Sequence, residues 1–230
     1  MTDSSIAANL ESIESRVAAA AARAGRHANE VTLVAVTKRV DPARVVEAHR
    51  CGLRDFGESY VQEAVPKITG LANLADARWH FIGHLQSNKI REVSGRFALI
   101  QSVDSVTLAE RLSKRAEETG TEIALLLEVK LDEAAAKYGL STASLLSAVE
   151  RVLALPGIKL CGLMGMAAPD PAAARSAFRL LNDCFLRLPS ASRQILSMGM
   201  TGDFETAIEE GSTMIRIGTG IFGARSPEAG

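Results

Sequence analysis

The sequence predicts a single (β/α)8 barrel (TIM barrel) of the α/β class, and three observations carry this prediction. Apolar segments rich in β-branched residues alternate with amphipathic segments of helical period along the chain. Eight strand candidates can be counted, which favours a closed parallel barrel over an open doubly wound sheet. The 230 residues contain no linker rich in Pro, Gly or Ser, which indicates one domain over residues 1–230.

Local signals place the elements in order. An amphipathic helix is expected over about 4–25, because apolar residues recur at helical spacing from Ile6 to Val17 and Gly25 follows. The barrel is expected over about 31–225. The predicted strands are 31–37, 53–58, 78–83, 97–105, 122–129, 158–166, 193–199 and 213–223. The predicted helices between them are 41–52, 59–68, 85–93, 107–120, 141–155, 171–188 and 204–211.

The composition indicates a soluble protein of the cytoplasm. A formal net charge of −1 provides no bulk attraction to nucleic acid or to an acidic membrane, so neither is an expected partner. Cys51, Cys161 and Cys184 form no C-x-x-C pair and are expected to be reduced thiols. The acidic N-terminus does not resemble a signal peptide, and no apolar run approaches the ~20 residues that cross a bilayer.

The carboxyl ends of the strands form the active face of a parallel barrel, so residues at these ends are candidate site residues. The sequence places there Lys38, Gly57-Glu58-Ser59, His80, Gly83-His84, Met164-Gly165-Met166, SMGMTGD (197–203) and RIGTG (216–220). The last two loops are rich in Gly, Ser and Thr, which lets backbone and hydroxyl donors approach an anion. Glycine-rich turns occur in any barrel, but a phosphate often binds between the loops after strands seven and eight. The pair of loops therefore favours a phosphate site.

Lys38 and Arg216 each allow a structural and a chemical interpretation. Lys38 is either a solvated strand end or a desolvated amine that forms a Schiff base with an aldehyde. A phosphate site across the barrel mouth makes a phosphorylated aldehyde a candidate ligand. Arg216 lies within an apolar run, where it forms either a buried ion pair or a fixed donor to a ring nitrogen or an acid group.

The methionines and histidines carry weaker signals. Five of the six methionines lie between 164 and 214, where they either pack in the core or line a pocket for a flat ligand. His80 and His84 are four residues apart, which along a strand spans about 13 Å and is too far for one metal ion. No metal site is predicted, and no G-x-S-x-G or P-loop motif is present.

Six ordered blocks resemble the pyridoxal phosphate homeostasis protein family, and the resemblance runs from about the first helix to Arg225, nearly the whole chain. They are LVAVTK (33–38), DFGESYVQEAVPKI (55–68), WHFIGHLQSNKIREV (79–93), SVDS (102–105), GLMGMAAPD (162–170) and LSMGMTGDFETAIEEGSTMIRIGTGIFGAR (196–225). The resemblance implies a barrel of fold type III that binds pyridoxal 5′-phosphate (PLP). Such a barrel is like the N-terminal domain of alanine racemase without that enzyme's C-terminal β domain.

The resemblance also implies roles for individual residues. Lys38 would hold PLP as a Schiff base, and Arg216 would face the pyridine nitrogen. The residues implied to bind the phosphate, or to lie in the same loop, are Ser197, Met198, Gly199, Gly218 and Thr219. Four further residues fall in matched blocks near the cofactor without a defined role: Glu58, Ser59, His80 and Met164.

One position and one loop depart from the family pattern. Ser59 stands where the family commonly has Asn, which weakens any side-chain amide contact near the ring. After the fifth strand, Lys130 replaces another Asn and alanines occupy 134–136, although Lys137 and Gly139 remain. The role of this loop in the present chain is therefore open.

An arginine at the pyridine nitrogen disfavours protonation of the ring and so weakens carbanion stabilisation. Racemases of this fold add a second acid or base from another domain or subunit, which this chain is not expected to have. We therefore expect a PLP-binding protein of intracellular vitamin B6 homeostasis and amino-acid balance, with little or no turnover. It is expected to be a monomer or weak dimer, with PLP-dependent apo-enzymes as candidate acceptors. The alternatives are an amino-acid racemase that uses Lys38 as base and a phosphosugar enzyme without PLP.

Overall fold

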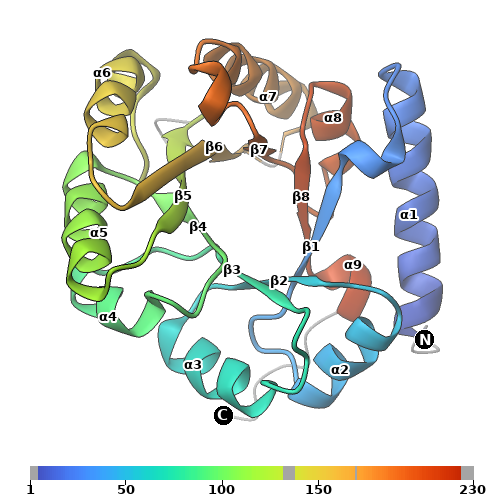
Figure 1. The fold of residues 1–230 in the computed structure, drawn as a ribbon. Coiled ribbons are helices and arrows are strands. Elements are labelled where there is room, and N and C mark those ends of the chain that lie inside the picture. The colour runs from blue at the N-terminus through green and yellow to red at the C-terminus, as the bar shows by residue number, and fades with distance from the viewer. Residues whose placement is uncertain (1–4, 132–137, 169, 224–230) are drawn as a thin grey trace.

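Eight parallel strands close into a barrel in the order of the sequence, with helices packed around it (Figure 1). This computed structural model describes residues 5–131, 138–168 and 170–223. The strands are β1 Thr32–Val36, β2 Asp55–Glu58, β3 Arg78–Phe81, β4 Leu99–Val103, β5 Ile123–Lys130, β6 Ile158–Met166, β7 Ile195–Ser197 and β8 Met214–Ile217. The α-helices are α1 Ile6–Arg23, α2 Pro42–Arg50, α3 Val61–Gly70, α4 Ile90–Val93, α5 Val106–Thr119, α6 Thr142–Leu153, α7 Pro171–Leu186, α8 Phe204–Glu209 and α9 Thr219–Phe222.

The predicted barrel is confirmed, and pairing between its first and last strands closes it. Val34 of β1 pairs with Asp55 of β2 on one side and with Arg216 of β8 on the other. Because all eight strands are parallel, their carboxyl ends meet at one mouth of the barrel. This arrangement brings the segments after β1, β2, β7 and β8 to the same face.

Helix starts follow the capping signals of the sequence. Asp41 accepts a hydrogen bond from the backbone nitrogen of Ala43 at 2.8 Å, and Pro42 occupies the first turn of α2. Asp170 accepts one from the nitrogen of Ala173 at 2.8 Å at the start of α7. These carboxylates satisfy backbone donors that a helix leaves without partners in its first turn.

Two predicted segments differ from the structure. Within the predicted strand 213–223, residues from Thr219 to Phe222 form the short helix α9, so the prediction of a last strand without a helix is wrong. The predicted helix 85–93 is a 3-10 turn, Ser87–Lys89, followed by the single turn α4. Elements of three or four residues are too short for their hydrophobic period to identify them. Residue 4, residues 224–225 and the loop alanines with Lys137 lie outside the described residues.

Helix α1 lies against the part of the barrel where β1 meets β8, beside α8 (Figure 1). Its buried face consists of the residues that show helical spacing in the sequence, Ile6, Leu10, Ile13 and Val17, together with Ala20 and Ala21. These residues share one hydrophobic cluster with Phe204 and Ile208 of α8 and Ile221 of α9. The N-terminal helix therefore covers the seam at which the chain closes on itself.

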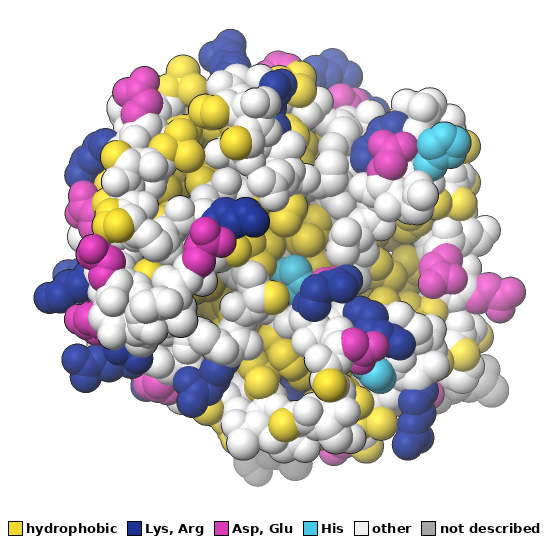
Figure 2. Space-filling view, in the orientation of Figure 1, with side chains coloured by type: hydrophobic (Ala, Val, Ile, Leu, Met, Phe, Trp, Pro, Cys, Tyr) yellow, Lys and Arg dark blue, Asp and Glu magenta, His cyan; other side chains and the backbone are white. Residues whose placement is uncertain are grey.

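The surface shows no single dominant charge on the face in Figure 2, where Lys and Arg side chains are interspersed with Asp and Glu. This mixture accords with the formal net charge of −1. None of the described helices is long and apolar enough to cross a membrane. All three cysteines are free thiols, of which Cys161 and Cys184 are buried and Cys51 is exposed.

Candidate functional site

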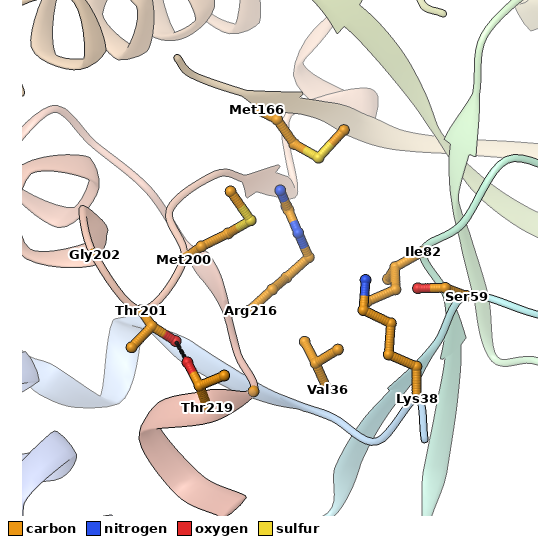
Figure 3. Close-up of a pocket in the computed structure, with 11 residues that line it drawn as sticks. Val36, Lys38, Ser59, Ile82, Met166, Met200, Thr201, Gly202, Arg216 and Thr219 are labelled. Carbon is orange, nitrogen blue, oxygen red and sulfur yellow. Dashed lines mark hydrogen bonds between the residues drawn. The ribbon is translucent and has the colours of Figure 1, made fainter. Parts of the chain in front are cut away.

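A cavity of about 290 Å³ opens among the carboxyl ends of the strands (Figure 3). Its lining residues are Val36, Lys38, Ser59, Ile82, Met166, Met200, Thr201, Gly202, Arg216, Gly218 and Thr219. These residues come from segments spread along most of the chain, which the closure of the barrel brings together. The volume is at the lower end of the ~300–1,000 Å³ that small-molecule sites occupy.

The backbone on both sides of Lys38 is held in place. Before it, the nitrogen of Thr37 donates to the carbonyl of Gly57 at 2.9 Å, and Lys67 Nζ donates to the carbonyl of Thr37 at 2.7 Å. After it, the nitrogen of Arg39 donates to Glu63 Oε1 at 2.5 Å. Figure 3 shows the Lys38 side chain extending into the cavity beside Ile82, with Arg216 opposite. The lysine is therefore presented to the cavity by a firmly anchored strand end.

Glu58 lies behind this strand end and outside the lining of the cavity. Its Oε1 accepts hydrogen bonds from Thr37 Oγ1 at 2.7 Å and from Lys67 Nζ at 2.8 Å, and the side chain is fully buried. Burial raises the pKa of Glu58 against the opposing effect of Lys67. Its Oε2 has no hydrogen-bond partner among the described residues. Glu58 thus supports the segment that carries Lys38.

Arg216 brings a buried guanidinium to the cavity. The side chain donates to Ser197 Oγ at 2.5 Å and to the carbonyl of Gly165 at 3.1 Å, which fixes its plane. Burial lowers the pKa of Arg216 to about 10, while the carboxylates of Glu128 and Asp203 act in the opposite direction. The guanidinium therefore stays charged at neutral pH, and as a group it can only donate hydrogen bonds.

A chain of hydrogen bonds runs from Arg216 through the barrel interior, and we call it the inner polar chain. Ser197 Oγ, which accepts from Arg216, donates to Gln101 Oε1 at 2.7 Å. Gln101 Nε2 lies 3.1 Å from His80 Nδ1, and His80 Nε2 lies 2.9 Å from Asp55 Oδ1. Because an amide nitrogen only donates, His80 accepts at Nδ1 and donates from Nε2 to Asp55. His80 therefore reaches the cavity only indirectly.

The inner polar chain ends at the carboxylate of Asp55, which accepts hydrogen bonds from two residues. Asp55 accepts from His80 and also from the partly exposed Arg78, whose Nε lies 2.8 Å from Oδ1. Burial raises the pKa of Asp55, but the hydrogen bonds from His80 and Arg78 outweigh this and hold it at about 2. Asp55 is thus ionised at neutral pH and orders the chain from its outer end.

A family model described as "Alanine racemase, N-terminal domain" matches residues 8–226. The pyridoxal phosphate homeostasis protein of Pseudomonas aeruginosa is 42% identical over 224 residues, which covers 96% of each chain. That of Escherichia coli K12 is 39% identical over 226 residues, covering 96% of this chain and 97% of its own. This chain belongs to the pyridoxal phosphate homeostasis protein family.

A solved structure of the same fold carries the cofactor. PipY of Synechococcus elongatus with PLP bound is 36% identical, and the match has a TM-score of 0.82 over 95% of this chain and 100% of PipY. The family predicted from the six sequence blocks is confirmed by these matches, as is the relation of the barrel to the N-terminal domain of alanine racemase.

The structure separates the residues that the sequence grouped as one site. Lining the cavity are Lys38, Ser59, Arg216, Gly218 and Thr219. Outside the lining are Glu58, Ser197 and Gly199, the last of which accepts a hydrogen bond from the backbone nitrogen of Arg216, and also His80, which connects to Arg216 only through Gln101 and Ser197. Met164 and Met198 are buried in hydrophobic clusters. The assignment of these residues to PLP stays a prediction.

Six lining residues were given no individual role from the sequence, four of them (Met166, Met200, Thr201 and Gly202) lying in named strand-end segments and two (Val36 and Ile82) outside them. Signals existed for each of them. Val36 is two residues before Lys38, on the same side of the strand by alternation. Thr201 and Gly202 lie in the SMGMTGD loop, and both methionines belong to the noted group between 164 and 214. Ile82 lies in the predicted strand 78–83, two residues after His80, so alternation offered the same signal for it.

His84 has a structural environment of its own. Its ring stacks on Tyr138 with 3.8 Å between centroids, and its Nδ1 lies 3.3 Å from Asp104 Oδ2. His80 has different partners, so the two histidines do not share a ligand position. Within the residues that the structure describes, no group of three or more His, Cys, Asp or Glu could hold a metal ion.

Proposed function

We propose that this protein binds PLP in the cavity at the carboxyl ends of its strands and acts in PLP homeostasis and amino-acid balance. The observation that carries the proposal is that Lys38 and Arg216 share one cavity with the two glycine- and threonine-containing loops. The names of the relatives and the PLP in the PipY structure support it. We further propose that it works in the cytoplasm as a single domain, monomeric or weakly dimeric.

The donor set of the cavity fits PLP. Lys38 supplies an amine for the aldehyde, and Arg216 supplies a donor for the ring nitrogen. The hydroxyls of Thr219 and Thr201 lie 3.3 Å apart next to Gly202 and Gly218, where they would hold the phosphate. The apolar walls suit a flat ring and consist of Val36, Ile82, Met166 and Met200. Ser197 would act through Arg216, which it orients.

Bound PLP supplies an electrophilic aldehyde and a ring that can accept electrons. The residues of this chain limit the second of these properties. Arg216 donates to its acceptors as a charged group, so a ring nitrogen that faced it would be held as an unprotonated acceptor. Lys38 and Arg216 are the only ionisable residues among the described lining of this cavity. These features support storage and release of PLP with little or no turnover, with PLP-dependent apo-enzymes as candidate acceptors.

An absorbance titration of purified protein with PLP tests the proposal. Wild-type protein is expected to become yellow, and borohydride reduction is expected to fix the mass of PLP on the peptide that contains Lys38. The Lys38→Ala variant should lose the fixed mass, because no other described amine lines the cavity. Lys159→Ala, at an exposed position, serves as the matched control and should behave like wild type.

Two results would contradict the proposal. Protein that stays colourless with added PLP would exclude PLP binding altogether. Rapid interconversion of D- and L-alanine by wild type, lost in Lys38→Ala, would favour the racemase alternative instead.

A further inference from the structure

A second cavity, of about 260 Å³, adjoins the first and shares Lys38 with it. Ser59, Ile82 and Met166 also line both. In Figure 3, Lys38, Ile82 and Ser59 stand together on one side of the first cavity, opposite Arg216. The residues that line only the second cavity are Tyr60, Gly83, His84, Ser102, Glu128 and Tyr138. Lys38 therefore stands in a wall common to both cavities, and the proposed PLP site accounts for only one of them.

Glu128 is the unusual group of the second cavity. It lies on β5, is only 7% exposed, and its carboxyl receives no hydrogen bond or ion pair from the described residues. Burial, with Asp104 acting in the same direction and Arg216 against it, raises the pKa of Glu128 to about 7. Desolvation of this carboxyl disfavours its charged form, at a cost in free energy. A ligand that brings donors into the cavity would remove this cost.

Apart from Lys38, the other polar groups of the cavity also favour a cation. Tyr138 stacks on His84, and His84 is paired with Asp104, so an aromatic face and a second carboxylate adjoin the cavity. Ser102 already donates to the carbonyl of Gly83, which leaves its oxygen as an acceptor. Carboxylates and aromatic faces attract ammonium groups. A primary ammonium group is compact and has three donors, which matches this set of acceptors.

We propose that the second cavity binds the primary ammonium group of an amine, with Glu128 as its main acceptor. The inference rests on the proposed PLP site, because it places an amine beside the lysine that would hold PLP. The shared chemistry admits two sources: a free amino acid and a lysine side chain presented by another protein.

The opening of the cavity leaves space for the body of such a ligand. Tyr60, Tyr138 and Met166 are 48%, 46% and 47% exposed around it. A third hollow of about 310 Å³ shares Ser59, Tyr60 and His84 and continues towards Gln86 and Lys89. An amine that enters the second cavity can therefore extend outwards over an apolar rim.

Calorimetric titration of PLP-free protein tests the inference without any reaction of PLP. The probes are L-alanine and Nα-acetyl-L-lysine amide, and diacetylated lysine amide, which has no ammonium group, serves as the ligand control. Glu128→Gln is expected to weaken binding by about tenfold or more, since it removes a charge-assisted hydrogen bond. Glu150→Gln, at an exposed position, removes the same charge elsewhere and should change nothing.

Each result of the titrations either supports or contradicts binding of an ammonium group by Glu128. Binding of alanine alone assigns a free amino acid, and binding of the lysine amide alone assigns a protein side chain. No binding of either probe, equal binding of the diacetylated control, or equal affinity of Glu128→Gln and wild type would overturn it. If Glu128→Gln does not fold, Tyr138→Ala at the exposed rim is expected to weaken binding by about threefold. Failure of wild type to take up PLP in the absorbance titration would instead contradict the proposed function.

Discussion

The pKa of the buried residue Asp55 is set by partners that are distant in the sequence. Alone, a carboxyl that is 6% exposed would have a raised pKa, because burial disfavours its charge. His80 and Arg78, both on the neighbouring strand β3, reverse this effect and bring the pKa to about 2. The carboxylate in turn fixes the tautomer of His80 and so the direction of the inner polar chain.

This low pKa predicts a pH dependence of stability. A carboxyl whose pKa is lower in the folded than in the unfolded state stabilises the fold above its unfolded pKa. The contribution of Asp55 is therefore complete above about pH 4 and lost as the pH falls towards 2. The drop from 3.8 to about 2 corresponds to about 2 kcal/mol. Urea denaturation at several pH values measures the difference in unfolding free energy between wild type and Asp55→Asn. This difference should shrink by about 2 kcal/mol as the pH falls towards 2.

The matched control is Asp183→Asn, at an exposed position on α7. Its difference from wild type should stay within about 0.5 kcal/mol at every pH. A difference for Asp55→Asn that is constant between pH 6 and pH 3 would contradict the explanation.

At the scale of one element, β6 depends on an irregularity at Gly162. The register between β5 and β6 shifts at Leu125 and Leu126, and Gly162 there has a φ of +150°. A Cβ on Gly162 would lie 1.9 Å from the carbonyl oxygen of Ile195, which is backbone and cannot move aside. The bulge lets β7 approach β6 closely, upstream of Gly165, whose carbonyl orients Arg216.

Gly162→Ala is therefore expected to lower the free energy of unfolding by about 3 kcal/mol or more. Chemical denaturation monitored by circular dichroism measures it, and absence of folded protein on expression is an extreme form of the same result. Gly70→Ala is the control, because a Cβ at the exposed end of α3 meets nothing within 4 Å. Gly70→Ala should stabilise by about 0.5 kcal/mol. A Gly162→Ala protein as stable as wild type would contradict this prediction and show that β7 can move away from β6.

At the scale of the whole molecule, the barrel closes between its first and last strands and α1 covers the seam. Leu10 is 3% exposed on the buried face of α1, in the cluster that includes Phe204 and Ile221 near the other end of the chain. Ion pairs between Arg16 and Glu205 and between Arg23 and Glu209 border this contact at the surface. Exposed pairs of this kind contribute little, so the apolar face must supply most of the stabilisation.

Leu10→Ala is expected to reduce the free energy of unfolding by about 2–5 kcal/mol, because it leaves a cavity at a contact between distant parts of the chain. Glu14→Ala, on the exposed face of the same helix, should change it by less than about 0.5 kcal/mol. Both values follow from urea denaturation. Equal effects of the two substitutions would mean that α1 is dispensable for the barrel.

How much of the structure could be predicted depends on how far along the chain each sequence signal acts. Periodicity and capping act within one element, so the eight strands, α1 and the start of α2 at Asp41 and Pro42 were predictable. The one-turn helices α4 and α9 carry too few residues for a period. Lys38 and Arg216 were found because the barrel rule translates a strand end into a position at the mouth.

The sequence by itself determined most of the elements, the barrel and the family, and it drew attention to Lys38, Arg216 and the two glycine-rich loops. Only the tertiary structure decided which side chains meet. Met164 and Met198 are buried in the core. Hydrogen bonds through Gln101 and Ser197 connect His80 to Arg216. Glu128 and Tyr138 line a second cavity beside Lys38. The physical reason is that such contacts depend on strand register and barrel closure, which pair residues far apart in the sequence.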